Sequence, residues 1–152
     1  MELINEMRLD FEALPENEAF ARLTVSGFLL PLDPTIEELA DVKTAVSEAV
    51  TNAIVHGYAG GGGTVRLRAG YTISGELRVE VIDRGCGIAD VKQAMQPFFT
   101  TASGDHERSG MGFTVMESFM DSVEVQSALG KGTTVHMEKH LGAPIELSAR
   151  RA

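Results

Sequence analysis

The chain has 152 residues, 43% of them hydrophobic and 23% charged, a composition typical of a globular domain rather than a disordered segment. Lys and Arg number 13 against 22 Asp and Glu, and the resulting formal charge of −9 argues against a surface that neutralises nucleic-acid phosphates. The single cysteine, Cys86, excludes an internal disulfide, and neither a leader-like start nor an apolar run long enough to span a bilayer is present. We therefore expect one cytoplasmic domain over residues 1–152, with no direct contact to nucleic acid or membrane.

The pattern of the first half of the chain predicts a strand followed by two helices. Apolar and polar residues alternate from Met7 to Ala13, which predicts a half-buried strand. Helical spacing follows over residues 16–30. The apolar face of that helix would consist of Phe20, Leu23, Gly27 and Phe28. Asp33 before Pro34 has the pattern of an N-cap and first helical residue, and it predicts a second helix that runs to about residue 56.

The second half reads as two hairpins separated by short helices. Glycines at 57 and 60–63 end the second helix, and alternating segments on either side of Ser74-Gly75 predict a hairpin. The remaining expected elements are a helix at 88–95, a polar loop at 97–109, a helix at 112–121, a hairpin turning at 129–132 and a loose tail at 141–152. The order β α α β β α α β β predicts an α+β two-layer sandwich.

The second helix carries the first candidate site. Glu48, Asn52 and His56 are spaced i, i+4, i+8 and would form one polar stripe beside the apolar face. A solvated helix face explains such a stripe as well. The neighbouring Ser47 and Thr51 are poor interior helix formers, and this favours a functional reading. A carboxylate and an amide here suit a general base beside an oxygen ligand for Mg²⁺.

Two glycine motifs supply further candidates. Asp83 ends an apolar strand and is followed by Gly85 and Gly87, so its carboxylate could accept a hydrogen bond from an exocyclic amine, although ordinary turn chemistry also explains the pattern. Gly110 and Gly112 open a helix whose N–H groups could bind phosphate, or they form a simple flexible helix start. Gly60 to Gly63 and Gly130 to Thr133 do not match a P-loop.

These motifs occur in one order: Glu48 to Asn52 on a helix, Asp83-x-Gly85-x-Gly87 after a strand, Gly110-x-Gly112 at a helix start, and Gly130-x-Gly132 near the end. The order resembles the N, G1 and G2 boxes of the GHKL ATPase superfamily. Within it, the chain is most similar to the small serine protein kinases that are anti-sigma factors, of the sigma F type of spore-forming bacteria. The similarity covers about residues 5–140. Its most specific stretches are 17–22, 47–58, 99–101 and 107–113.

The resemblance implies a sandwich with a mixed, mostly antiparallel sheet and helices on one face, and it implies roles for individual residues. Glu48 would orient or deprotonate the attacking serine, Asn52 would ligate Mg²⁺, and Asp83 would read the adenine amine. Glycines 110 and 112 would cradle phosphates under a lid that spans about 97–109. The full expected ATP or ADP site is Asn52, His56, Asp83, Gly85, Gly87, Ile88, Thr100, Thr101, Arg108, Ser109, Gly110, Met111, Gly112, Phe113 and Thr133.

The resemblance also implies partners. Such a protein would be a homodimer that binds and inhibits a sporulation sigma factor of the sigma F type and phosphorylates a serine of an anti-anti-sigma factor. Arg22 and Asn17 would contact these partners. Two alternatives remain open, an anti-sigma factor of the general stress type and a binding module that uses nucleotide without catalysis. A histidine-kinase catalytic domain is disfavoured, because no upstream helix offers a histidine.

Overall fold

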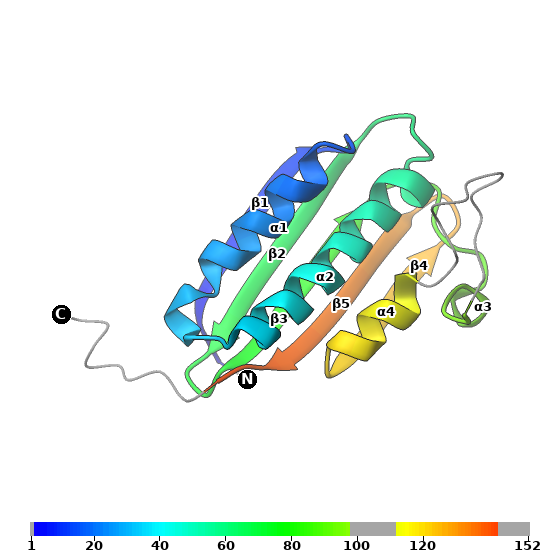
Figure 1. The fold of residues 1–152 in the computed structure, drawn as a ribbon. Helices are drawn as coiled ribbons and strands as arrows, with labels where there is room; N and C mark the ends of the chain where they lie inside the picture. Colours follow the sequence, from blue (N-terminus) through cyan, green and yellow to red (C-terminus); the bar gives the residue numbers. More distant parts are fainter. Residues whose placement is uncertain (1, 98–111, 143–152) are drawn as a thin grey trace.

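A five-stranded sheet forms the base of the molecule in the computed structural model, which describes residues 2–97 and 112–142 (Figure 1). Its strands are β1 (Leu3–Glu12), β2 (Thr64–Thr72), β3 (Glu76–Asp83), β4 (Ser122–Ala128) and β5 (Gly132–His140). They lie in the order β1-β2-β3-β5-β4, and all four ladders among them are antiparallel. Both expected hairpins are confirmed, as is the sandwich fold class. The first strand begins earlier than the expected Met7.

Helices cover one face of the sheet. They are α1 (Asn17–Phe28), α2 (Ile36–Asn52), the short α3 (Val91–Ala94) and α4 (Gly112–Phe119), with a 3-10 turn η1 (Leu30–Leu32) and a π-helical turn η2 (Ala53–Gly57). In Figure 1, α1, α2 and α4 lie side by side over the sheet, with α2 in the middle. Because alternate strand residues such as Leu67, Val79 and Met137 point at these helices, the single apolar core lies between the two layers.

The opposite face of the sheet carries charged side chains. Arg68 pairs with Glu80 on the neighbouring strand at 3.8 Å, and Arg78 pairs with Glu138 at 3.3 Å. This is the inward-apolar, outward-polar alternation of an antiparallel sheet covered on one side. Among the residues that the structure describes, no helix combines the length and apolar character needed to span a bilayer.

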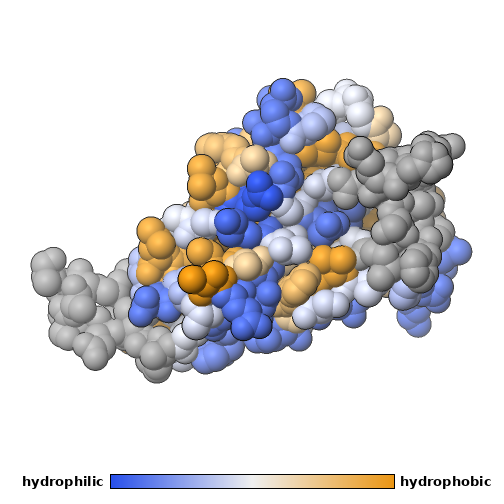
Figure 2. All heavy atoms as spheres, viewed as in Figure 1, coloured by the Kyte–Doolittle hydropathy of each residue, from blue (hydrophilic) through white to orange (hydrophobic). Residues whose placement is uncertain are grey.

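The expected apolar face of α1 is confirmed at Phe28, which packs against the core, but is wrong at Phe20 and Leu23. Phe20 and Leu23 are 49% and 70% exposed, whereas Ala21 and Val25 are fully buried. Ala21, Val25 and Phe28 also follow helical spacing, and these smaller first two side chains allow α1 to lie close against α2. Figure 2 shows the consequence, since apolar side chains appear among polar ones on the surface over α1.

The expected start of α2 is also wrong. Thr35 caps the helix: its hydroxyl accepts from the Glu38 N–H at 3.0 Å, and the Glu38 carboxylate accepts from the Thr35 N–H at 2.9 Å. Asp33 instead has a left-handed backbone with φ of 48° and ends η1. The reciprocal pair satisfies two helix N–H groups, whereas Asp33 could satisfy one at most, and the helix therefore starts two residues after Pro34.

Candidate functional site

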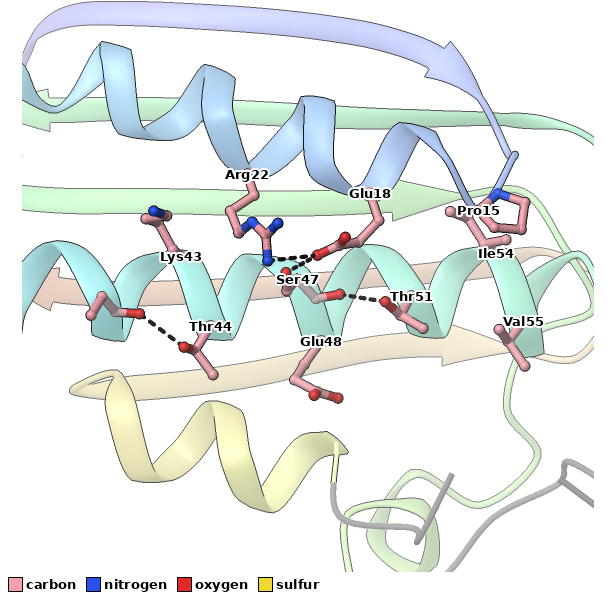
Figure 3. Close-up of a pocket in the computed structure, with 11 residues that line it drawn as sticks. Pro15, Glu18, Arg22, Lys43, Thr44, Ser47, Glu48, Thr51, Ile54 and Val55 are labelled. Carbon is pink, nitrogen blue, oxygen red and sulfur yellow. Dashed lines mark hydrogen bonds and ion pairs between the residues drawn. The ribbon is translucent and has the colours of Figure 1, made fainter. Parts of the chain in front are cut away.

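Helix α2 places two candidate site side chains next to the start of α4. Glu48 and Asn52 are one turn apart and half-buried, and Figure 3 shows the Glu48 side chain turned toward α4. A Cβ at Gly112, the first residue of α4, would lie 3.0 Å from Asn52 Nδ2 and 3.4 Å from Glu48 Oε2. The two side chains therefore lie together beside a glycine at the start of a helix.

The stripe of α2 does not continue to His56 with α-helical geometry. The chain changes to the π-helical turn η2 at Ala53, and the Tyr58 N–H donates to the Ala53 carbonyl at 3.0 Å. The carbonyls at the end of this turn face the loop after β3. His56 O accepts from Cys86 Sγ at 3.1 Å and Gly57 O accepts from the Cys86 N–H at 2.7 Å. The π turn thus bonds the end of α2 to this loop, residues 84–90, which we call the glycine loop.

Asp83 ends β3 as a buried acid, with 6% of its surface exposed. The Gly85 N–H donates to its Oδ1 at 2.9 Å, and the Thr133 N–H also donates to the carboxylate. Burial raises the pKa of the Asp83 carboxyl above its ordinary value, and these two hydrogen bonds oppose the shift. Such a carboxylate is a fixed hydrogen-bond acceptor, which recognition of an exocyclic amine requires.

Glycines let other segments approach this acid closely. A Cβ at Gly57 would lie 2.7 Å from the Asp83 carboxyl carbon, and a Cβ at Gly85 would lie 1.8 Å from the Gly57 carbonyl oxygen. Gly87 has a φ of +74°, and a Cβ there would lie 2.0 Å from the Ala128 oxygen. The close backbone contacts alone therefore require glycine at positions 85 and 87, because any side chain there would collide with a neighbouring segment.

Sequence reasoning missed three residues that shape the site. The sequence pattern predicts Gly57 only as a helix breaker. Tyr58 accepts from the Arg84 N–H at 2.8 Å and donates to the Thr64 carbonyl at 2.6 Å, so it holds the chain just after Asp83. Ser127 accepts from the Ile88 N–H at 2.7 Å. Gly57 and Tyr58 lie within the resemblance stretch 47–58, which is a usable signal, whereas no sequence pattern distinguishes Ser127.

A cleft of about 810 Å³ lies between α1 and α2 (Figure 3). Arg22 and Glu18 of α1 face it as an ion pair at 3.6 Å, and the Ser47 hydroxyl of α2 donates to the Glu18 carboxylate. Glu48 also lines the cleft. The expected partner-contacting arginine and the expected base are therefore joined by one continuous depression.

The other expected site residues fall into two groups. Asn17 donates to the Glu12 carbonyl at 2.9 Å and so stabilises the turn before α1, while the Phe113 side chain is buried in the core. Outside the described residues lie Thr100, Thr101, Arg108, Ser109, Gly110 and Met111, together with most of the expected lid. Within the described ranges, no group of three or more His, Cys, Asp or Glu side chains is arranged to hold a metal ion.

Residues 11–139 match the model of the histidine kinase-like ATPase domain. The chain is 56% identical over 137 residues to the anti-sigma F factor of Clostridium acetobutylicum, covering 90% of this chain and 94% of that protein. It is 53% identical over 143 residues to the anti-sigma F factor of Thermoanaerobacter sp. strain X514, covering 94% and 99%. The chain belongs to the anti-sigma F factor family. As a member of this family, it carries a GHKL-type ATPase domain along nearly its whole length.

The fold of this family member also matches solved structures. The RsbU and RsbW domains of Rv1364c from Mycobacterium tuberculosis superpose with a TM-score of 0.65 at 19% identity, and the match covers 93% of this chain and 34% of that one. At this level of identity the likeness concerns the fold, which agrees with the antiparallel sheet covered by helices on one face.

Proposed function

We propose that this protein is an anti-sigma factor that binds and inhibits a sporulation sigma factor of the sigma F type and uses Mg-ATP to phosphorylate a serine of an anti-anti-sigma factor. The observation that carries the proposal is the convergence of Glu48 and Asn52 on Gly112. The names of relatives that are 53% and 56% identical over at least 90% of the chain support the sigma partner. We further propose that it acts in the cytoplasm as a homodimer.

In the proposed site, a nucleotide binds with its base at Asp83 and its phosphates at Gly112. Asp83 would accept from the adenine amine, with Gly85, Gly87, Ile88 and Thr133 around the base. Asn52 offers an amide oxygen to Mg²⁺, and the glycine at the start of α4 leaves room for phosphate beside it. His56, Phe113 and the segment 100–111 complete the proposed site by family resemblance. Bound Mg²⁺ would neutralise charge on the phosphates during transfer.

Glu48 would supply the chemistry of transfer. Its carboxylate takes the proton of the serine hydroxyl as the serine oxygen forms a bond to the γ-phosphorus. The bond from that phosphorus to the β,γ-bridging oxygen breaks, and ADP leaves with the electron pair. Phosphoryl transfer needs mainly positioning and charge stabilisation, so one base, one metal ligand and backbone N–H groups suffice.

We propose that the protein partner that is phosphorylated docks in the cleft between α1 and α2. Arg22 lies on its α1 wall and Glu48 on its α2 wall, so a partner held by Arg22 could present a serine to Glu48. Arg22 is already oriented by Glu18, which Ser47 holds in turn. Asn17 would then act indirectly, since its amide fixes the turn that leads into α1.

The decisive experiment incubates the protein with Mg-ATP and an anti-anti-sigma factor and follows phosphate on serine by mass spectrometry. Glu48→Gln should slow transfer by about a hundredfold or more, because the base is lost, while nucleotide affinity stays within about twofold. Glu37→Gln removes an exposed acid at the start of the same helix and serves as the matched control.

The alternatives predict different outcomes. If the wild-type protein binds nucleotide but transfers no phosphate, it is a nucleotide-dependent binding module. If it transfers phosphate but captures a general stress sigma factor in preference to sigma F, it belongs to the general stress type.

A further inference from the structure

Ser127, on the edge strand β4, forms hydrogen bonds with three neighbours at the adenine end of the proposed site. Its hydroxyl oxygen lies 2.7 Å from the Ile88 nitrogen, 3.0 Å from the Gly132 carbonyl oxygen and 2.8 Å from Thr133 Oγ1. Ile88 lies in the loop after β3, and Gly132 and Thr133 are the first two residues of β5. One hydroxyl thus joins the glycine loop to the second hairpin.

Counting protons fixes the direction of each bond. A serine hydroxyl has one proton to donate and two lone pairs to accept with. The Ile88 N–H can only donate and the Gly132 carbonyl can only accept, so the single Ser127 proton points at Gly132. The hydroxyl of Thr133 must then donate to Ser127. Having used its proton, Thr133 Oγ1 can act toward any further group only as an acceptor.

Thr133 stands beside Asp83. The two residues are partners in the β3–β5 ladder, and the Thr133 N–H donates to the Asp83 carboxylate. Both are buried, with 8% and 6% of their surfaces exposed. The end of the sheet therefore presents two neighbouring acceptors, a carboxylate and a hydroxyl oxygen whose proton is turned away.

We propose that Ser127 is a positioning residue that sets base selectivity by holding the Thr133 hydroxyl as an acceptor. The inference rests on the proposed nucleotide site. A purine with an amino group at position 6 donates to this pair of acceptors, whereas a 6-oxo purine places a third acceptor opposite them and carries its proton on N1 instead. Without Ser127, the Thr133 hydroxyl can rotate and donate to the 6-oxo group, which removes part of the discrimination.

The test measures the dissociation constants of ATP and of inosine triphosphate, which differs from ATP in carrying an oxo group at position 6. Ser127→Ala should reduce the ratio of the two constants about three- to tenfold. Ser127→Thr keeps a hydroxyl and should retain the wild-type ratio. Ser122→Ala makes the same chemical change at the exposed start of β4 and should alter neither constant.

A double-mutant cycle tests the route of the effect. Thr133→Val removes the hydroxyl itself, so adding Ser127→Ala to that variant should change the ratio no further. A general loosening of the loop would weaken both nucleotides equally and leave the ratio unchanged. An unchanged ratio in Ser127→Ala, or additive effects in the double variant, overturns the inference.

Two other outcomes are separable. If Ser127→Ala does not fold, Ser127→Cys has the same shape with a poorer acceptor, and the same fall in the ratio is required of it. If the wild-type protein binds neither nucleotide, the proposed function fails. If it prefers ATP and the ratio survives the substitutions, only the role of Ser127 is rejected.

Discussion

Asp83 shows how a residue of the proposed site can oppose stability. Its carboxylate is buried and accepts hydrogen bonds from the N–H groups of Gly85 and Thr133, yet burial still raises its pKa. A raised pKa means that the folded state favours the protonated acid. The contribution of this group to stability is therefore fully present at low pH and is lost as pH rises through the pKa of the folded state.

Asp83→Asn should accordingly weaken ATP binding about tenfold or more, because an amide is a poorer acceptor for the amine, while leaving the nucleotide-free protein at least as stable as the wild type. The stability difference should be largest at neutral pH and shrink as the pH is lowered through the Asp83 pKa. Isothermal titration calorimetry gives the affinity, and thermal melts across pH give the stability. A variant that melts well below the wild type at neutral pH would contradict this account.

The sequence alone singles out Glu48, Asn52 and Asp83 as candidates, because the order of their motifs resembles the boxes of the GHKL ATPases. It does not identify Ser127 or the reason for Gly57. The role of Ser127 depends on three partners from other segments, and Gly57 matters because it lies against a carboxylate 26 positions away in the chain. Contacts between distant segments leave no local pattern.

Two predictions about single helices differ from the structure: the start of α2 and the buried face of α1. Asp33-Pro34 and Thr35-x-x-Glu38 are competing start signals, and the second prevails because it forms two bonds. In α1, larger apolar residues suggest one face and smaller ones another. The neighbouring helix decides between them, since only the side with Ala21 and Val25 allows α2 to lie close. The buried face of a helix is therefore determined by packing against its neighbour and not by helical periodicity alone.

The capping box gives a direct prediction. Thr35→Ala should lower the free energy of unfolding by about 1 kcal/mol, because the Glu38 N–H loses its acceptor. Asp33→Gly should be neutral or slightly stabilising, since Asp33 has a left-handed backbone that glycine adopts without strain. Urea denaturation of the two variants measures both values. The reverse order would mean that Asp33 is the cap.

In the molecule as a whole, the two faces of the sheet differ, because helices cover only one of them. The helical face holds the proposed nucleotide site and the cleft with Arg22, and the other face carries paired charges. The net charge of −9 suits a basic protein partner that itself handles DNA. Layer order and class follow from the order of elements in the sequence. The cleft does not, because it depends on how closely α1 approaches α2.

Arg22→Ala should therefore weaken binding of both the sigma factor and the anti-anti-sigma factor about tenfold, with a smaller salt dependence, and leave ATP affinity unchanged. Arg8→Ala removes the same charge from the exposed outer side of β1 and provides the control. Surface plasmon resonance at two salt concentrations measures the effect. Equal losses for the two variants would show that the effect is not specific to the cleft.

The π-helical turn at Ala53–Gly57 has a consequence for how this chain can vary in length. The turn holds one residue more than an α-helical turn between Asn52 and the carbonyls that meet Cys86. Each residue of a helix rotates the chain by about 100°, so deleting one residue here would swing the Gly57 carbonyl away from the glycine loop. Single substitutions at Val55 would keep that geometry. Before Gly57, the number of residues in this turn is therefore constrained more strictly than the identity of a half-buried residue such as Val55.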